Sequence, residues 1–129
     1  MKKISLFIFI SFVLLGFNSL LAQAPKKINI EYSDFADVNQ VEIPDAILLT
    51  GNVRISHDGA ILTCKKAYFF SKENYVKAFG EVQIVQGDTL FLNSKYAEYN
   101  GNVKQAYATG NVVLKSPDMR LVTDTLNFD

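Results

Sequence analysis

The chain has 129 residues, 49% of them hydrophobic, and its 13 basic and 13 acidic side chains give a formal net charge of zero. A neutral chain with scattered Lys residues lacks the positive surface that nucleic-acid binding needs, so no nucleic-acid partner is expected. A single Cys excludes an internal disulfide, so packing and hydrogen bonds must hold the core.

The N-terminus has the pattern of a secretory signal peptide. Two Lys residues precede an apolar run over residues 4–17, and small residues follow at Ala22 and Ala24. We predict cleavage after Ala22, so that residues 1–22 are the signal peptide and residues 23–129 form one domain. No later apolar stretch approaches the ~20 residues of a membrane-spanning helix. We therefore expect an exported, soluble protein without an anchor.

The mature segment contains three copies of a repeat of about 30 residues. Each copy has a Gly, then Asn or Glu, then Val, and the glycines are Gly51, Gly80 and Gly110. Apolar residues occupy alternate positions around each Gly, and this period of two predicts a strand with one dry face. The candidate lining residues on that face are Leu49, Val53, Ile55, Val76, Val82, Ile84, Val112 and Leu114.

A second element follows each of these strands after a turn. It begins with Leu, continues with small and charged residues, and ends with an apolar residue and an aromatic, over 62–69, 92–99 and 121–128. The leading Leu and the final pair, an apolar residue and an aromatic, have opposite parity along the strand, which predicts a bulge or corner between two strand pieces. Turn dipeptides such as Asp58-Gly59 and Asn100-Gly101 predict hairpins between the elements. The repeats therefore indicate an all-β fold of antiparallel strands.

The glycine in the middle of each strand has two interpretations. Glycine inside a strand often marks a bulge, a bend or a close approach of another group. Three glycines at the same phase let the sheet bend sharply, either around a packed interior or around space for a ligand. We treat Gly51, Gly80 and Gly110 as structural glycines and leave these two interpretations open.

Little in the sequence suggests catalysis. His57 is the only His, and its place beside Asp58-Gly59 predicts an exposed turn residue. Cys64 aligns with Ser94 and Thr123 of the other copies, which predicts a small strand residue instead of a reactive thiol. The carboxylates are dispersed without the spacing of a metal-binding loop. We expect no enzyme activity, no cofactor and no metal site.

At these residues the sequence resembles the LptA/OstA family, the periplasmic lipopolysaccharide-transport and organic-solvent-tolerance β proteins. The resemblance is carried by Gly-Asn-Val at Gly51 and Gly110, Gly-Glu-Val at Gly80, and the segments 28–34, 87–90 and 123–129. It covers residues 28–129. It implies a β-jellyroll folded like a taco shell, with a hydrophobic groove for acyl chains and open edges through which members stack end to end.

Two departures from the family pattern affect this interpretation. Lys65 and Lys95 stand where the family would have an acidic residue, which is present at Asp34 and Asp124. The chain also stops directly after the third copy of the second element, at Asp129. Either the last strand pairs with another molecule, or the chain is the N-terminal part of a longer protein.

The leading hypothesis is a periplasmic lipopolysaccharide-binding and transport protein. The resemblance implies that the eight candidate lining residues shield acyl chains, whereas the residues alone favour simple packing. Expected partners are lipopolysaccharide or a similar lipid and like-folded transport proteins at the edge strands, including a head-to-tail homo-oligomer. The alternative is a non-transporting structural or docking domain of a larger outer-membrane assembly protein. A glycan-binding or hydrolytic domain is disfavoured because the chain has no Trp and no recognisable catalytic carboxylate pair.

Overall fold

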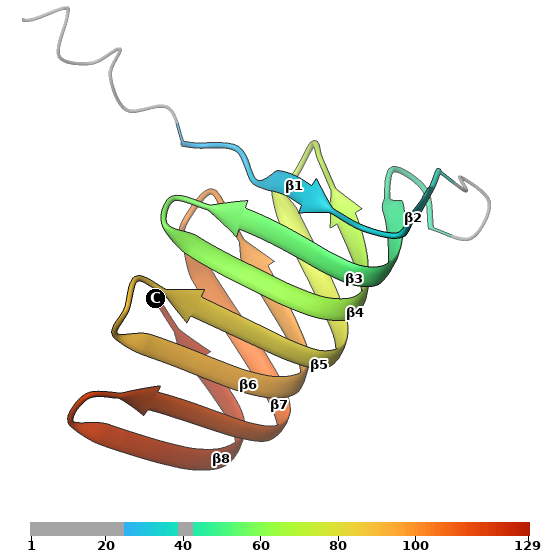
Figure 1. Ribbon diagram of the computed structural model, residues 1–129. Coiled ribbons are helices and arrows are strands. Elements are labelled where there is room, and N and C mark those ends of the chain that lie inside the picture. The colour runs from blue at the N-terminus through green and yellow to red at the C-terminus, as the bar shows by residue number, and fades with distance from the viewer. Residues whose placement is uncertain (1–24, 39–42) are drawn as a thin grey trace, which may run out of the picture.

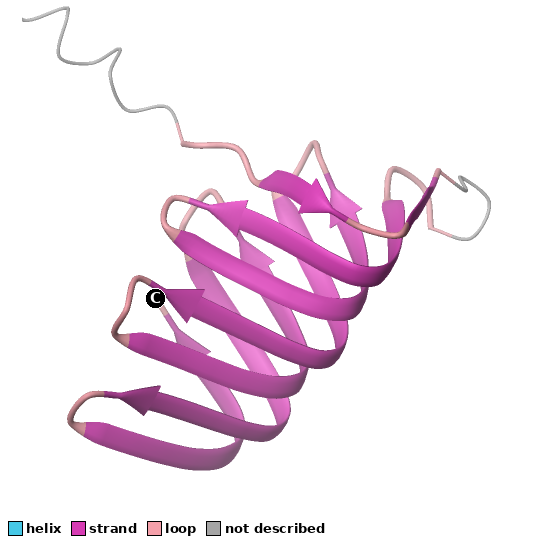
Figure 2. Cartoon of the chain, in the orientation of Figure 1, coloured by secondary structure: helices cyan, strands magenta, loops and turns pink. Residues whose placement is uncertain are grey.

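The computed structural model describes residues 25–38 and 43–129, and the signal peptide expected over residues 1–22 lies outside them (Figure 1). The described part contains strands and no helix, as Figure 2 shows. The predicted all-β class is therefore confirmed. The strands are β1 (Asn29–Tyr32), β2 (Phe35–Asp37), β3 (Ile47–His57), β4 (Ala60–Phe70), β5 (Tyr75–Gln86), β6 (Leu90–Asn100), β7 (Gln105–Ser116) and β8 (Met119–Phe128).

All eight strands belong to one antiparallel sheet with the order β1-β3-β4-β5-β6-β7-β8, and β2 pairs with β3 beside β1. From β3 onward, each strand pairs with the next along the chain. The hairpin turns predicted from their residues form these connections: Asp58 and Gly59 both have positive φ, as a two-residue type I′ turn requires. The sheet does not close on itself, so β8 forms one edge and β1 with β2 forms the other.

Each long strand bends near its middle, and the sheet folds over on itself there (Figure 1). The pairing of β3 with β4 shifts between Thr50 and Val53, where Gly51 and Asn52 together face one residue of β4. The same shift recurs at Gly80 in β5 and at Gly110 in β7. A β-bulge of this kind bends a strand and increases its twist. The corner predicted from parity in the second elements is confirmed in β4 and β6, where the buried positions change phase between Cys64 and Ala67 and between Ser94 and Ala97, opposite these bulges.

The bend divides the sheet into two leaves. Leaf 1 contains the strand halves that end in the β3–β4, β5–β6 and β7–β8 turns, together with β1. Leaf 2 contains the halves that end in the β4–β5 and β6–β7 turns, together with β2. Side chains that alternate along each strand point inward from both leaves and form one hydrophobic core. The fold is thus a single open sheet whose two leaves pack on each other like a taco shell.

Candidate functional site

The eight candidate lining residues all lie in the core between the leaves. Their exposed fractions run from 0 to 8%, so none of them points to solvent. Leaf 1 carries six, which are Val53, Ile55, Val82, Ile84, Val112 and Leu114, and leaf 2 carries Leu49 and Val76. The structure therefore brings the predicted apolar face together as the inner surface of one folded sheet.

The eight candidate lining residues leave out most of the inner surface of leaf 2. Four alanines, Ala67, Ala78, Ala97 and Ala108, pair in register across β4 to β7 and are fully buried. This alanine row lies directly beside the bend, where small side chains let the two leaves approach closely. The signal was present in the second element, whose Ala before the aromatic recurs at Ala67 and Ala97.

Two cavities show how much free space the interior holds. A small apolar cavity of about 10 Å³ lies among Ile55, Leu62, Val76 and Ile84, so the core around these residues is filled. A larger cavity of about 300 Å³ opens between the ends of the leaves, toward β7 and β8. Its apolar lining includes Ala60, Ile84, Tyr99, Ala106 and Phe128, and its polar lining includes His57, Asp58, Gln86, Lys104 and Asp129. This volume is at the lower end for sites that hold small molecules.

Polar side chains join the two leaves at the β3–β4 end of this cavity. His57 of leaf 1 and Tyr99 of leaf 2 form a hydrogen bond of 2.6 Å between Nδ1 and the phenol oxygen. His57 Nε2 lies 3.0 Å from the carbonyl oxygen of Lys26, which can only accept, so this nitrogen carries the proton. Nδ1 therefore accepts the hydrogen bond from the Tyr99 hydroxyl. Next to this contact, Asp58 forms an ion pair with Lys104 of the β6–β7 turn.

The prediction that His57 is an exposed turn residue is wrong. Only 4% of its surface is exposed, and both ring nitrogens have partners. The cause is tertiary, because Lys26 lies far away in the sequence and its main chain crosses over the imidazole. Local turn chemistry at Asp58-Gly59 contains no sign of this cover.

Residues 25–28 form a strap across the ends of the leaves, held mainly by Asn74 of the β4–β5 turn. Asn74 is 1% exposed, and its amide accepts from the Ile28 N–H at 2.7 Å and donates to the Lys26 carbonyl at 2.8 Å. The main-chain carbonyl of Asn74 also accepts a hydrogen bond from the Gly101 N–H at 2.8 Å. Ile28 is buried in the core beside these contacts. The strap thus closes the β3–β4 end of the interior and leaves the β7–β8 end less covered.

One side-chain hydrogen bond recurs at every corner of the sheet. Cys64 Sγ donates to the carbonyl of Lys66, Ser94 Oγ to that of Tyr96, and Thr123 Oγ1 to that of Thr125. Ser33 Oγ makes the same contact with the carbonyl of Phe35 at the start of β2. Burial raises the pKa of the Cys64 thiol to about 11, so the thiol stays protonated and acts as a donor.

The residue after each corner donor covers the glycine of the next long strand. A Cβ atom at Gly80 would lie 3.1 Å from Lys65 Cβ, and one at Gly110 would lie 2.8 Å from Lys95 Cβ. Asp34 covers Gly51 in the same way, and its N–H donates to the Gly51 carbonyl at 2.8 Å. These glycines are therefore required by two conditions at once, a positive φ and a side chain packed against Cα.

Electrostatic effects concentrate at the turns and on the outer face of leaf 2. Hydrogen bonds from Lys104 and Lys26 lower the pKa of Asp58 to about 2. Partial burial, with Glu98 nearby, raises the pKa of Tyr96 to about 12 and that of Tyr75 still further. These tyrosines therefore stay neutral at physiological pH.

The chemistry of this site is that of an apolar interior with a polar rim. Over residues 25–38 and 43–129, no group of three or more His, Cys, Asp or Glu side chains is arranged to hold a metal ion. The same residues include no helix long and apolar enough to cross a membrane.

Comparison with known proteins gives one result that bears on identity. The family model described as OstA-like protein matches residues 25–129, which are most of the chain and all of its described strands. A search of curated proteins finds no match. The resemblance seen in the Gly-Asn-Val repeats is therefore confirmed, and the chain belongs to the OstA-like family.

Proposed function

We propose that this chain is a periplasmic protein that binds the acyl chains of lipopolysaccharide, or of a similar lipid, between the two leaves. Membership of the OstA-like family supports a role related to lipid transport. The observation that carries the proposal is the cavity of about 300 Å³ between the leaf ends, which continues from an apolar core to a rim of charged and polar side chains. A ligand with a hydrocarbon chain and a polar head matches that order of chemistry.

The burial of hydrocarbon supplies the driving force. At about 0.8 kcal/mol per CH₂ group, shielding a chain of ~14 carbons from water contributes roughly 11 kcal/mol. The eight candidate lining residues already pack against one another in the core, so an acyl chain that enters beyond the cavity must separate the leaves there. Part of the gain therefore offsets the loss of packing between the leaves. Because the driving force is apolar, affinity should change little with salt concentration.

Photocrosslinking tests whether lipid reaches the interior. A photoreactive side chain at Val112, which points inward, should form an adduct with lipopolysaccharide, whereas one at the neighbouring Val113 should not. Val113 lies on the same strand and points to the outer face, so it controls for non-specific lipid contact. Equal adducts at both positions, or none at Val112, would contradict the proposal.

A cavity-filling substitution tests the same proposal by affinity. Ala106 lines the cavity, and Ala106→Leu adds three carbons there without introducing a polar group. We expect lipid binding to fall about tenfold or more while the circular dichroism spectrum is unchanged. Gln105→Leu, at the next residue on the outer side, is the matched control and should bind lipid as the native chain does.

The structural alternative remains a second candidate function. The open edge at β8 favours it, because a sheet edge that is not closed can serve as a platform for another chain whether or not lipid is bound. In that case the Ala106→Leu variant would keep its partner binding and the native chain would show no lipid adduct. Pairing with like-folded partners at the edges is common to both candidates.

A further inference from the structure

The two cavities of the interior meet at four shared side chains. The outer cavity, of about 300 Å³, and the inner cavity, of about 10 Å³, are both lined by His57, Ala60, Ile84 and Tyr99. Beyond these four residues, the inner cavity is lined by core residues such as Leu62, whereas the outer cavity continues to its charged rim. A hydrocarbon chain that extends from the outer cavity into the inner one must therefore pass these four side chains.

Tyr99 lies across the boundary between the two cavities. In leaf 2 it pairs with Val76, which lines the inner cavity, and with Ala106, which lines the outer cavity. From this position on β6 its ring reaches His57 at the end of β3, in leaf 1. The two ring centroids are 5.3 Å apart, in an edge-to-face arrangement at 65°. The phenol thus spans the interior from one leaf to the other.

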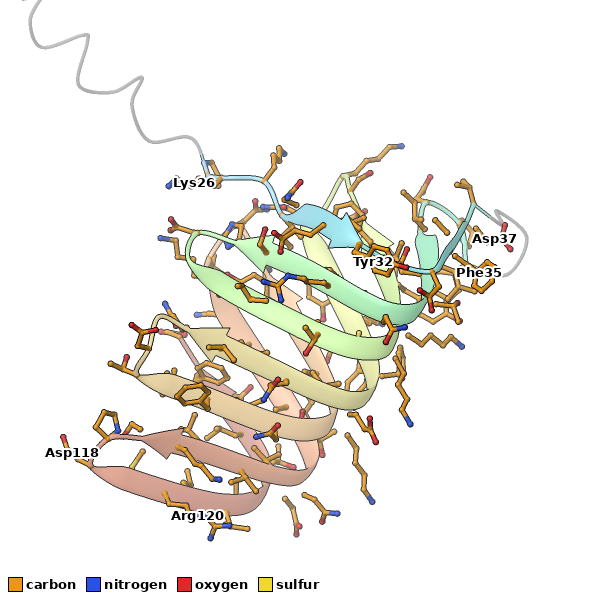
Figure 3. All side chains as sticks on the ribbon, viewed as in Figure 1. Lys26, Tyr32, Phe35, Asp37, Asp118 and Arg120 are labelled. Atoms are coloured by element: carbon orange, nitrogen blue, oxygen red, sulfur yellow. The ribbon has the colours of Figure 1, made fainter. Side chains whose placement is uncertain are left out.

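One hydrogen bond holds Tyr99 in this position. Its hydroxyl donates to His57 Nδ1 at 2.6 Å. Partial burial and the nearby carboxylate of Asp58 raise the pKa of Tyr99, so the hydroxyl keeps the proton that it donates. On the other side of the imidazole, the Lys26 carbonyl accepts both from His57 Nε2 at 3.0 Å and from Asn74 at 2.8 Å. Figure 3 shows Lys26, which holds the imidazole, at the turn ends of the leaves and away from the bend.

The other two shared residues do not join the leaves. Ala60 and Ile84 both belong to leaf 1 and have no polar side-chain atoms. A turn of the Tyr99 side chain breaks one hydrogen bond, whereas a turn of the His57 ring also breaks its bond to the strap. Because side chains occupy discrete rotamers, a turn of Tyr99 gives the boundary two distinct states, bonded and open.

We infer that Tyr99 and His57 form a latch that limits how deeply a hydrocarbon chain enters the interior. With the hydrogen bond formed, the chain is confined to the outer cavity; when Tyr99 turns away from His57, the chain reaches the inner cavity. Tyr99 is the moving part and His57 the fixed one. This inference rests on the proposed binding of acyl chains and adds the residue pair that controls their depth.

Photocrosslinking with dodecanoate, a single-chain carboxylate, tests the latch in the full chain. A diazirine side chain in place of Leu62 reports hydrocarbon in the inner cavity, and one in place of Val103 reports it in the outer cavity. In the native background, adducts should form mainly at Val103. Tyr99→Phe keeps the ring and removes the hydroxyl. The ratio of Leu62 to Val103 adducts should then rise about fivefold, the change in population that the loss of one ordinary hydrogen bond allows.

Tyr107→Phe is the matched control. Tyr107 lies on the neighbouring strand β7 and points to the outer face, because Ala106 and Ala108 on either side of it are buried in the interior. Loss of the hydroxyl there should leave the adduct ratio unchanged. Circular dichroism checks that both variants fold.

The imidazole gives a second measurement that needs no substitution. His57 is the only His of the chain, so the nitrogen NMR signals of isotope-labelled histidine report this ring alone. Dodecanoate should shift the Nδ1 signal toward that of an unprotonated nitrogen without a hydrogen bond. The Nε2 signal should stay in place, because the bond to the Lys26 carbonyl is kept.

Several results would overturn the inference. These are no dodecanoate adduct at either position, equal adduct ratios in the native and Tyr99→Phe chains, an equal rise with Tyr107→Phe, or an Nδ1 signal that dodecanoate does not move. The lipopolysaccharide adduct at Val112 is measured separately, in β7 and away from the inner cavity. Adducts at Val112 with an unchanged dodecanoate ratio would refute the latch and leave the lipid proposal standing. A raised ratio without any lipopolysaccharide adduct would support the latch and contradict lipopolysaccharide binding.

Discussion

Replacement of Gly110 by Ala tests whether the covered glycines hold the bend of the sheet. Gly110 has φ of +88°, and a Cβ there would lie 2.8 Å from Lys95 Cβ, an atom that cannot move without its main chain. Gly59 is the matched control, because its φ is +87° and a Cβ there would meet nothing within 4 Å. The two substitutions thus share the backbone strain and differ in the contact.

The expected magnitudes follow from these two terms. Alanine in the left-handed region costs about 1–2 kcal/mol, and its stiffer unfolded chain offsets about 0.4–1 kcal/mol of this. Gly59→Ala should therefore lower the free energy of unfolding by roughly 1 kcal/mol. Gly110→Ala adds the overpacking against Lys95, which costs about 1–3 kcal/mol. We expect Gly110→Ala to destabilise the fold by about 2–4 kcal/mol in total.

Urea denaturation followed by circular dichroism measures both free energies. Lys95→Gly in the Gly110→Ala background should recover more of the loss than Lys95→Ala does, because both remove Cγ and Cδ at 3.2 Å but only Lys95→Gly removes the Cβ at 2.8 Å. The reasoning is refuted if the two alanine variants unfold within about 0.5 kcal/mol of each other, or if Lys95→Ala rescues as well as Lys95→Gly does.

Three further predictions concern the corners, the strap and the cavity rim. Cys64→Ser should keep close to the native stability, because a hydroxyl can donate to the Lys66 carbonyl as Ser94 does to that of Tyr96. Cys64→Val loses this hydrogen bond, so its free energy of unfolding, measured by thermal denaturation, should fall by about 1 kcal/mol. A Val variant more stable than the native chain would contradict this. Asn74→Ala should cost about 2–4 kcal/mol in urea denaturation because it leaves the buried Ile28 N–H without its acceptor, and Asn102→Ala, which removes one exposed partner, should cost less. The pKa of Asp58 is lowered from 3.8 to about 2 in the folded chain, so its stabilising effect is complete above about pH 4 and is lost as the pH falls toward 2. Asp58→Asn should therefore unfold with a weaker acid dependence over pH 2–4 than the native chain, and identical pH profiles would exclude a role for these ion pairs.

The repeated pattern in the sequence predicted much of the fold because it is local. Alternation around Gly51, Gly80 and Gly110 identified the inner face, since strand periodicity depends only on successive residues. The change of parity between Leu92 and Tyr99 identified the corner for the same reason.

Other features depend on contacts between distant segments. Nothing near His57 in the sequence indicates that Lys26 crosses over it, so local turn chemistry gave the wrong exposure for this side chain. Asn74 likewise resembles an ordinary turn residue, and its role as the anchor of the strap follows only from the position of Ile28. The alanine row was visible in the sequence, but its place beside the bend was not.

Residues adjacent along the chain were enough to predict the long strands, the inner face around each glycine and the corners of the second elements. How the leaves close at one end and leave a cavity at the other, and which side chain covers each glycine, depends on contacts across the sheet. Those outcomes depend on how the bulges set the register between neighbouring strands. A bulge moves every residue beyond it relative to the next strand, so the pairing of Lys95 with Gly110 is fixed across the sheet and not along the chain.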